Sequence, residues 1–140
     1  MDMVNRYLPA LGRLLIAAIF LLSGLNKIAS PDATQAYIAS AGLPAPFLAY
    51  LVAVVVEVGG GILLLIGYQA RLAALVLALF TIAAAFGFHH KFGDQNQFIH
   101  FFKNLAMAGG LLQVVAFGAG AFSIDAWRGA TANSSALRAA

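Results

Sequence analysis

A single carboxylate stands inside the long apolar stretches of this chain. Glu57 lies near the middle of the apolar stretch at about 47–66. The other acidic residues all fall outside such stretches: they are Asp2, Asp32, Asp94 and Asp125. An ionisable side chain in an apolar helix is costly, so it usually faces the interior of a helix bundle and has a partner. Two interpretations of Glu57 stay open: an ion pair that fixes helix register, and a carboxylate that binds a proton or a ligand.

Two cations are the candidate partners of this carboxylate. Arg13 lies a few residues inside the first apolar stretch, and Lys103 lies a few residues inside the last one. At 1.5 Å per residue, both are within roughly 8–10 Å of the level of Glu57 along the bundle axis. Because arginine and lysine side chains are long enough to cover much of that gap, we expect a Glu57–Arg13 or a Glu57–Lys103 pair.

Polar residues also gather near one end of the first and last stretches, with the spacing i, i+3, i+4 on each. The two groups are Ser23, Asn26 and Lys27, and His100, Lys103 and Asn104. This spacing places each group on one face of a helix. We expect a polar vestibule at this end of the bundle. The alternative is that the two lysines only extend to the membrane interface.

The histidines provide no convincing metal site. His89, His90 and His100 flank a polar loop before the last stretch, and no carboxylate is spaced from them as in a metal motif. We interpret them as solvated loop residues and predict no metal. The sequence has no cysteine, which excludes disulfides, thiolate metal sites and a dithiol redox centre in this chain. No cofactor is predicted for the chain on its own.

These residues must be positioned by membrane helices. Of the 140 residues, 62% are hydrophobic and only 9% are Asp, Glu, Lys or Arg, against about 25% charged residues in soluble domains. Lipid requires backbone groups to be satisfied internally, and long continuous apolar stretches favour helices over the alternating strands of a barrel. The net charge of +3 is scattered along the chain, so we expect the lipid bilayer, and no nucleic acid, as a partner.

The fold class predicted is an all-α integral membrane four-helix bundle. The spans are placed at about 8–28, 47–66, 72–88 and 101–117 within one domain covering 1–128. A short amphipathic helix is predicted over residues 32–42, a turn follows over 42–46, and residues 129–140 are predicted to be a flexible tail.

An even number of spans places both termini on the same side of the membrane. That side carries five arginines, Arg6, Arg13, Arg71, Arg128 and Arg138, and the other side carries three lysines, Lys27, Lys91 and Lys103. The positive-inside rule therefore predicts cytoplasmic termini for a multi-pass protein of the bacterial inner (plasma) membrane.

Three segments together resemble the DoxX family. Residues 13–27 resemble its opening span, residues 57–67 its second-span signature and residues 103–112 its fourth span, in the right order and spacing. The resemblance implies a four-helix bacterial inner-membrane protein. The family is named for a subunit of an archaeal thiosulfate:quinone oxidoreductase, and other members are associated with redox or oxidative-stress partners. The family's characteristic polar positions match Arg13, Lys27, Glu57, Lys103 and Asn104, although their chemical role does not come with the match.

Three functions remain in competition. The leading hypothesis is an accessory subunit of a redox-linked membrane complex that is not catalytic alone. Contact with a quinone, redox protein partners and homo-oligomerisation are each left open. The alternatives are a small-molecule or proton-coupled carrier that uses Glu57, and a structural anchor. A quinone site predicts an apolar cleft open to lipid with Lys103, Asn104 or His100 at its mouth. A carrier predicts a water-lined cavity that reaches Glu57, and an anchor predicts a closed bundle with its charges paired.

Overall fold

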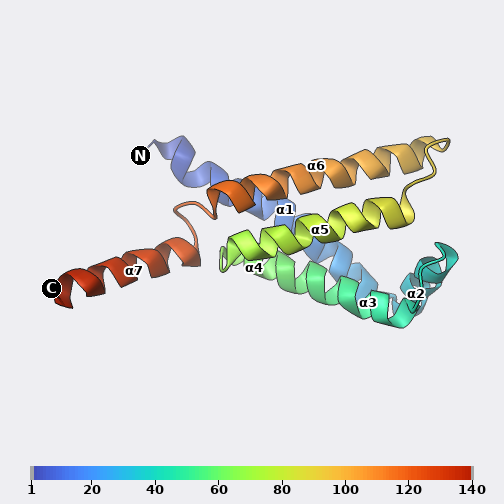
Figure 1. The fold of residues 1–140 in the computed structure, drawn as a ribbon, viewed down its shortest axis with the longest axis horizontal. Coiled ribbons are helices and arrows are strands. Elements are labelled where there is room, and N and C mark those ends of the chain that lie inside the picture. The colour runs from blue at the N-terminus through green and yellow to red at the C-terminus, as the bar shows by residue number, and fades with distance from the viewer. Residues whose placement is uncertain (1, 140) are drawn as a thin grey trace.

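The protein is a bundle of α-helices in the computed structural model, which describes the backbone of residues 2–139 and the side chains of residues 2–131 (Figure 1). The helices in chain order are α1 (Met3–Ala29), α2 (Pro31–Ser40), α3 (Pro46–Val54), η1 (Val55–Gly59), α4 (Gly60–Ile66), α5 (Ala70–Phe88), α6 (Gln95–Phe117) and α7 (Ile124–Ala139). No strand occurs among these residues.

Within the described residues, four helical stretches are long and apolar enough to cross a membrane. They are α1, the continuous stretch Pro46–Ile66 formed by α3, η1 and α4, then α5 and α6. The predicted all-α bundle with four membrane helices is therefore confirmed. All four begin before the predicted spans, α1 and α6 by the most residues. Helix α6 begins early because Asp94 caps it: its carboxylate accepts hydrogen bonds from the backbone N–H groups of Asn96 and Gln97, at 2.8 and 3.2 Å.

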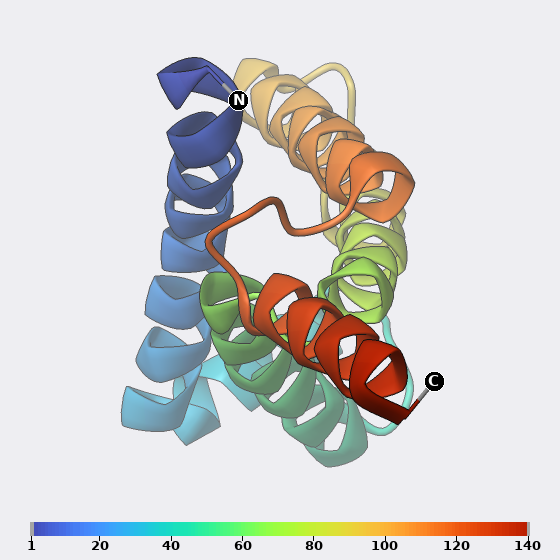
Figure 2. The ribbon, with the colours of Figure 1, turned by 90° about the vertical axis from the view of Figure 1, so that its left-hand side faces the viewer.

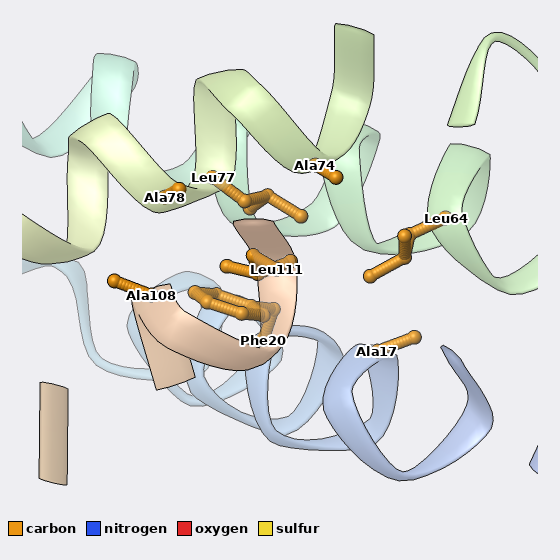
Figure 3. Packing of buried hydrophobic residues seen from close by; sticks show 8 residues of the cluster. All are labelled: Ala17, Phe20, Leu64, Ala74, Leu77, Ala78, Ala108 and Leu111. Carbon is orange, nitrogen blue, oxygen red and sulfur yellow. The ribbon is translucent and has the colours of Figure 1, made fainter. Parts of the chain in front are cut away.

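Helices α5 and α6 form an antiparallel hairpin, and α1 packs against the second span along α4 and η1. Viewed nearly along the bundle, α1 and the α5–α6 hairpin stand on opposite sides, with the second span below them (Figure 2). The side chains that meet between them form one apolar cluster of eight residues: Ala17, Phe20, Leu64, Ala74, Leu77, Ala78, Ala108 and Leu111. Half of these residues are alanines, which let the helix backbones approach closely (Figure 3).

The second and third spans diverge along their length. Helix α4 packs against α5, whereas α3 makes almost no contact with α5 and instead packs against α2. Figure 1 shows α3 leaning away from α5 toward the end of the bundle where α2 and the 89–94 loop lie. We name this end the loop end, and the opposite end, where α1 begins and α7 leaves, the terminal end. The divergence opens a space at the loop end.

The segments outside the four membrane helices agree with the prediction in part. Helix α2 confirms the predicted short helix, and a turn follows it before α3. Helix α7 covers Ile124–Ala139, so most of the segment predicted as a flexible tail is helical. Its flexibility stays a prediction, and residue 140 lies outside the described residues.

Candidate functional site

Glu57 forms a buried ion pair with Lys27. The Lys27 Nζ lies 2.9 Å from Oε2 of Glu57 and donates a hydrogen bond to Oε1 at 3.1 Å. Ser23 completes the cluster, because its hydroxyl accepts from Lys27 Nζ at 2.8 Å and donates to Glu57 Oε1 at 3.2 Å. Glu57 is only 5% exposed, while the Lys27 side chain is 25% exposed. The charges are thus neutralised inside the bundle.

The backbone around Glu57 explains how this carboxylate reaches α1. Glu57 is the central residue of η1, a single π-helical turn within the second span. Such turns are rare and are frequent at functional sites. Across from it, a Cβ placed on Gly24 would lie 2.6 Å from Cγ2 of Val58 and 3.3 Å from Cβ of Glu57. The glycine therefore permits a close approach of α1 and η1, and the Glu57 side chain lies beside Ser23 and Lys27.

The expected Glu57–Arg13 pair is wrong. The Arg13 side chain is buried and turns toward the terminal end, where Nη1 donates to the backbone oxygens of Leu64 and Leu65 at 2.8 and 3.0 Å. Its Nη2 donates to the backbone oxygen of Phe122. Leu64 and Leu65 lie at the C-terminal end of α4, where Leu64 O also accepts from the backbone N–H of Gly67 at 3.2 Å. A cation near a helix C-terminus is favourable. Both Nη atoms of the guanidinium are thus hydrogen-bonded without Glu57, whereas Nε is buried and has no hydrogen-bond partner.

The expected Glu57–Lys103 pair is also wrong. Lys103 is exposed on α6, and within the part of the chain whose side chains are described it has no ion-pair partner. Helix α6 packs mainly against α5 and only slightly against α1, so its outward face is remote from the ion pair. Depth along the bundle axis does not determine the direction of a side chain around its helix, and the exposed Lys103 does not reach Glu57.

A cavity of about 660 Å³ adjoins the ion pair at the loop end. Its lining includes the ion pair of Lys27 and Glu57, and further polar groups come from Ser23, Thr34, Tyr37, His89 and Asn104. Most of its wall is apolar and comes from α2, α3 and α5, including Ile38, Ala49, Val52, Ala53, Phe80, Ala83 and Ala84. A largely apolar cavity with a few convergent polar groups is typical of a small-molecule site.

Helix α2 and the turn after it cover this cavity at the loop end. Tyr37 stacks on Phe88 of α5, with ring centroids 5.2 Å apart. A Cβ placed on Gly87 would lie 3.7 Å from Leu43 Cδ1, so the Leu43 side chain of the turn lies close to α5. Between α3 and α5, where the spans diverge, the lining residues Val52 and Ala83 are exposed. In a bilayer, this side of the cavity faces lipid.

Three of the six residues expected to form the polar vestibule line this cavity. Ser23, Lys27 and Asn104 line the cavity, whereas Asn26, His100 and Lys103 do not. His89 lines it as well, with Nδ1 at 3.2 Å from Gln97 Oε1. His100 stacks on the His89 ring at 5.1 Å between centroids, so it contacts the site only indirectly.

No group of three or more His, Asp or Glu side chains that could hold a metal ion exists among the described residues. The prediction of no metal stays a prediction. The cavity wall itself was not predicted. It includes small residues of the second and third spans, such as Ala49, Ala53, Ala83 and Gly87, which are equally expected where helices pack closely.

Comparison with known proteins shows which family the chain is similar to. A model of the DoxX family matches residues 8–90. The chain is 39% identical to the inner membrane protein YqjF of Escherichia coli over 81% of this chain and 85% of that protein. It is 36% identical to the E. coli inner membrane protein YphA over 82% of this chain and 86% of that protein.

A more distant match is with a Bacillus subtilis protein named "Putative oxidoreductase CatD", 35% identical over 51% of this chain and 52% of that protein. No solved structure matches. The family model, the two relatives named as inner membrane proteins and the four apolar helices agree with one another. The chain is an inner-membrane protein that belongs to the DoxX family.

Proposed function

We propose that this protein is an accessory subunit of a redox-linked membrane complex and that its cavity binds a lipid-soluble, quinone-like molecule. The observation that carries the proposal is the cavity itself: an apolar chamber beside a buried polar cluster, open toward lipid between α3 and α5. A molecule that dissolves in the bilayer can enter such a chamber without crossing water.

The polar groups at the chamber fit the carbonyl or hydroxyl oxygens of a quinone or its reduced form. The Asn104 amide makes no hydrogen bond to any group in the described part of the chain, so its donors and acceptor are free for a ligand. His89 uses Nδ1 with Gln97, which leaves Nε2 for a second contact. Both side chains can form hydrogen bonds with a ligand at the wall of an apolar site.

The redox assignment is supported by the name of the distant B. subtilis relative, which includes the word oxidoreductase. The chain has no cysteine, so a partner protein would carry the electron-transfer groups. A carrier that uses Glu57 is disfavoured because both carboxylate oxygens contact Lys27. A closed anchor is disfavoured by the cavity and by the exposed Lys103.

The test is purification of the tagged protein from its native membrane in mild detergent, with bound small molecules and proteins identified by mass spectrometry. We expect a stoichiometric quinone-like lipid and a redox protein. Asn104→Leu should lower the bound quinone, while Asn26→Leu, an exposed amide outside the cavity, should not. Recovery of neither a quinone nor a redox protein would contradict the proposal.

A further inference from the structure

The ion pair of Lys27 and Glu57 stands at the wall of the apolar cavity. The Lys27 ammonium meets both Glu57 oxygens, at 2.9 and 3.1 Å, at the wall of an apolar cavity of about 660 Å³. A lone ammonium beside an apolar chamber would attract any amphiphile with an acidic head group, because charge-assisted hydrogen bonds are strong at low dielectric. A bilayer contains such acids.

From this geometry we infer that Glu57 is a specificity-determining residue that excludes anionic amphiphiles and restricts the cavity to neutral ones. The inference deepens the proposed function and rests on it for the statement that a lipid-phase ligand enters at all. The class of ligand it names is an uncharged amphiphile with a carbonyl or hydroxyl head, such as a quinone or a long-chain alcohol.

Three points support the inference that Glu57 excludes anionic ligands. The Lys27 ammonium donates to Glu57 Oε1 and to the Ser23 hydroxyl and lies 2.9 Å from Glu57 Oε2, so its charge is already neutralised before a second anion arrives. An anion that displaced Glu57 would leave a buried carboxylate without its cation, which is costly. The remaining polar groups of the lining that face no partner, such as the Asn104 amide, are neutral.

The structure also explains why Lys27 binds the Glu57 carboxylate in preference to the carboxylate of a free fatty acid. Gly24 permits the close approach of α1 and η1, and Ser23 bridges the two charged groups with hydrogen bonds of 2.8 and 3.2 Å. Glu57 is therefore held beside Lys27 by the fold and loses little further freedom in making the contact. A free fatty acid has to give up its own translational freedom to compete.

The experiment compares two photoreactive probes of equal chain length, a dodecanol and a dodecanoate that each carry a diazirine. The full chain is reconstituted in phosphatidylcholine nanodiscs in mildly alkaline buffer, so that the acid is ionised. Labelling of the α3 and α5 residues that line the cavity is measured by mass spectrometry and normalised to labelling of the lipid-facing residue Phe102. The quantity of interest is the ratio of acid to alcohol labelling.

We expect the wild-type cavity to be labelled by the alcohol and to show a low acid-to-alcohol ratio. Glu57→Gln should raise that ratio by about tenfold or more, since the freed ammonium gains a charge-assisted partner. The double variant Lys27→Gln/Glu57→Gln should return the ratio to the wild-type value. Asp2→Asn removes the same charge outside the membrane spans and should leave the ratio as in the wild type.

A ratio that stays within twofold in Glu57→Gln while the alcohol still labels the cavity would overturn the inference and leave the proposed function standing. A wild-type cavity labelled by neither probe, with strong acid labelling in Glu57→Gln, would contradict the proposed function and support the exclusion. If Glu57→Gln does not fold, the wild-type protein provides the test. Equal labelling of its cavity by acid and alcohol overturns the inference. A low acid-to-alcohol ratio in the wild type, together with recovery of the folded variant when dodecanoate is added, supports the inference.

Discussion

Lys27 and Glu57 lie 30 residues apart in the sequence, and the Lys27 ammonium contacts both oxygens of the Glu57 carboxylate. The pair joins the first span to the second at the wall of the cavity. It therefore has two consequences that can be measured separately: it holds α1 against η1, and it sets the charge that a ligand meets.

The first prediction concerns the stability of this pair. Glu57→Gln leaves a cation without its partner, which costs about 3–5 kcal/mol in soluble proteins. Because the Lys27 side chain is 25% exposed and can turn toward the interface, we expect a smaller loss, about 1–3 kcal/mol. Thermal unfolding in a non-ionic detergent provides the measurement.

A double-mutant cycle identifies the partner. Adding Lys27→Gln to Glu57→Gln should recover part of the lost stability, whereas adding Arg13→Gln or Lys103→Gln should not. Coupling of Glu57 to Arg13 or Lys103 of the size expected for Lys27 would contradict the observed geometry.

The importance of Glu57 could be read from the sequence, but its partner could not. A charged residue in an apolar span stands out by type alone, and the i, i+3, i+4 spacing placed Ser23 and Lys27 on one face of α1. The choice between cations depends on side-chain direction. Arg13 turns to the carbonyls at the end of α4 and Lys27 turns inward to Glu57, and neither direction follows from depth along the bundle.

The four spans were predictable because hydropathy and length determine them. The cavity was not, because it arises where α3 and α5 diverge, and helix crossing angles are set by packing over many residues. The π-helical turn at Glu57 and the helix α7 likewise have no pattern in the sequence that identified them.

Gly24→Ala should weaken the contact between α1 and η1. The added methyl would approach the Val58 side chain to 2.6 Å and Glu57 Cβ to 3.3 Å, so one helix has to move, at a cost of about 1–3 kcal/mol. Gly12→Ala on the same helix is the matched control, because a Cβ there meets nothing within 4 Å. Equal melting temperatures of the two variants would show that the close approach does not matter.

Arg13→Lys should destabilise the terminal end although it keeps the charge. The buried guanidinium donates hydrogen bonds to the backbone oxygens of Leu64, Leu65 and Phe122. One ammonium on a shorter side chain cannot reach all three oxygens. We expect a loss of about 2 kcal/mol. Arg71→Lys is the control: Arg71 also donates to two carbonyls but is exposed, and water can replace its contacts. A larger loss in the control would contradict this account.

The topology prediction can be tested with reporters. The arginines of the terminal end predict cytoplasmic termini, so a periplasm-active reporter fused after the last residue should give no signal. A fusion in the 89–94 loop should be active there. The reverse pattern would place the loop end, and with it His89 and the covered end of the cavity, in the cytoplasm.

The most direct test of the central claim, that the cavity between α3 and α5 takes a ligand from the lipid phase, is to fill it. Ala84→Phe places a ring within the lining, while Ala106→Phe adds the same ring to an exposed position of α6 outside the cavity. The measurement is the dissociation constant of a short-chain quinone for each reconstituted variant. We predict that Ala84→Phe weakens binding by about tenfold or more, by loss of buried apolar contact, and that Ala106→Phe binds as the wild type does. Equally tight binding by Ala84→Phe and the wild type would contradict the claim.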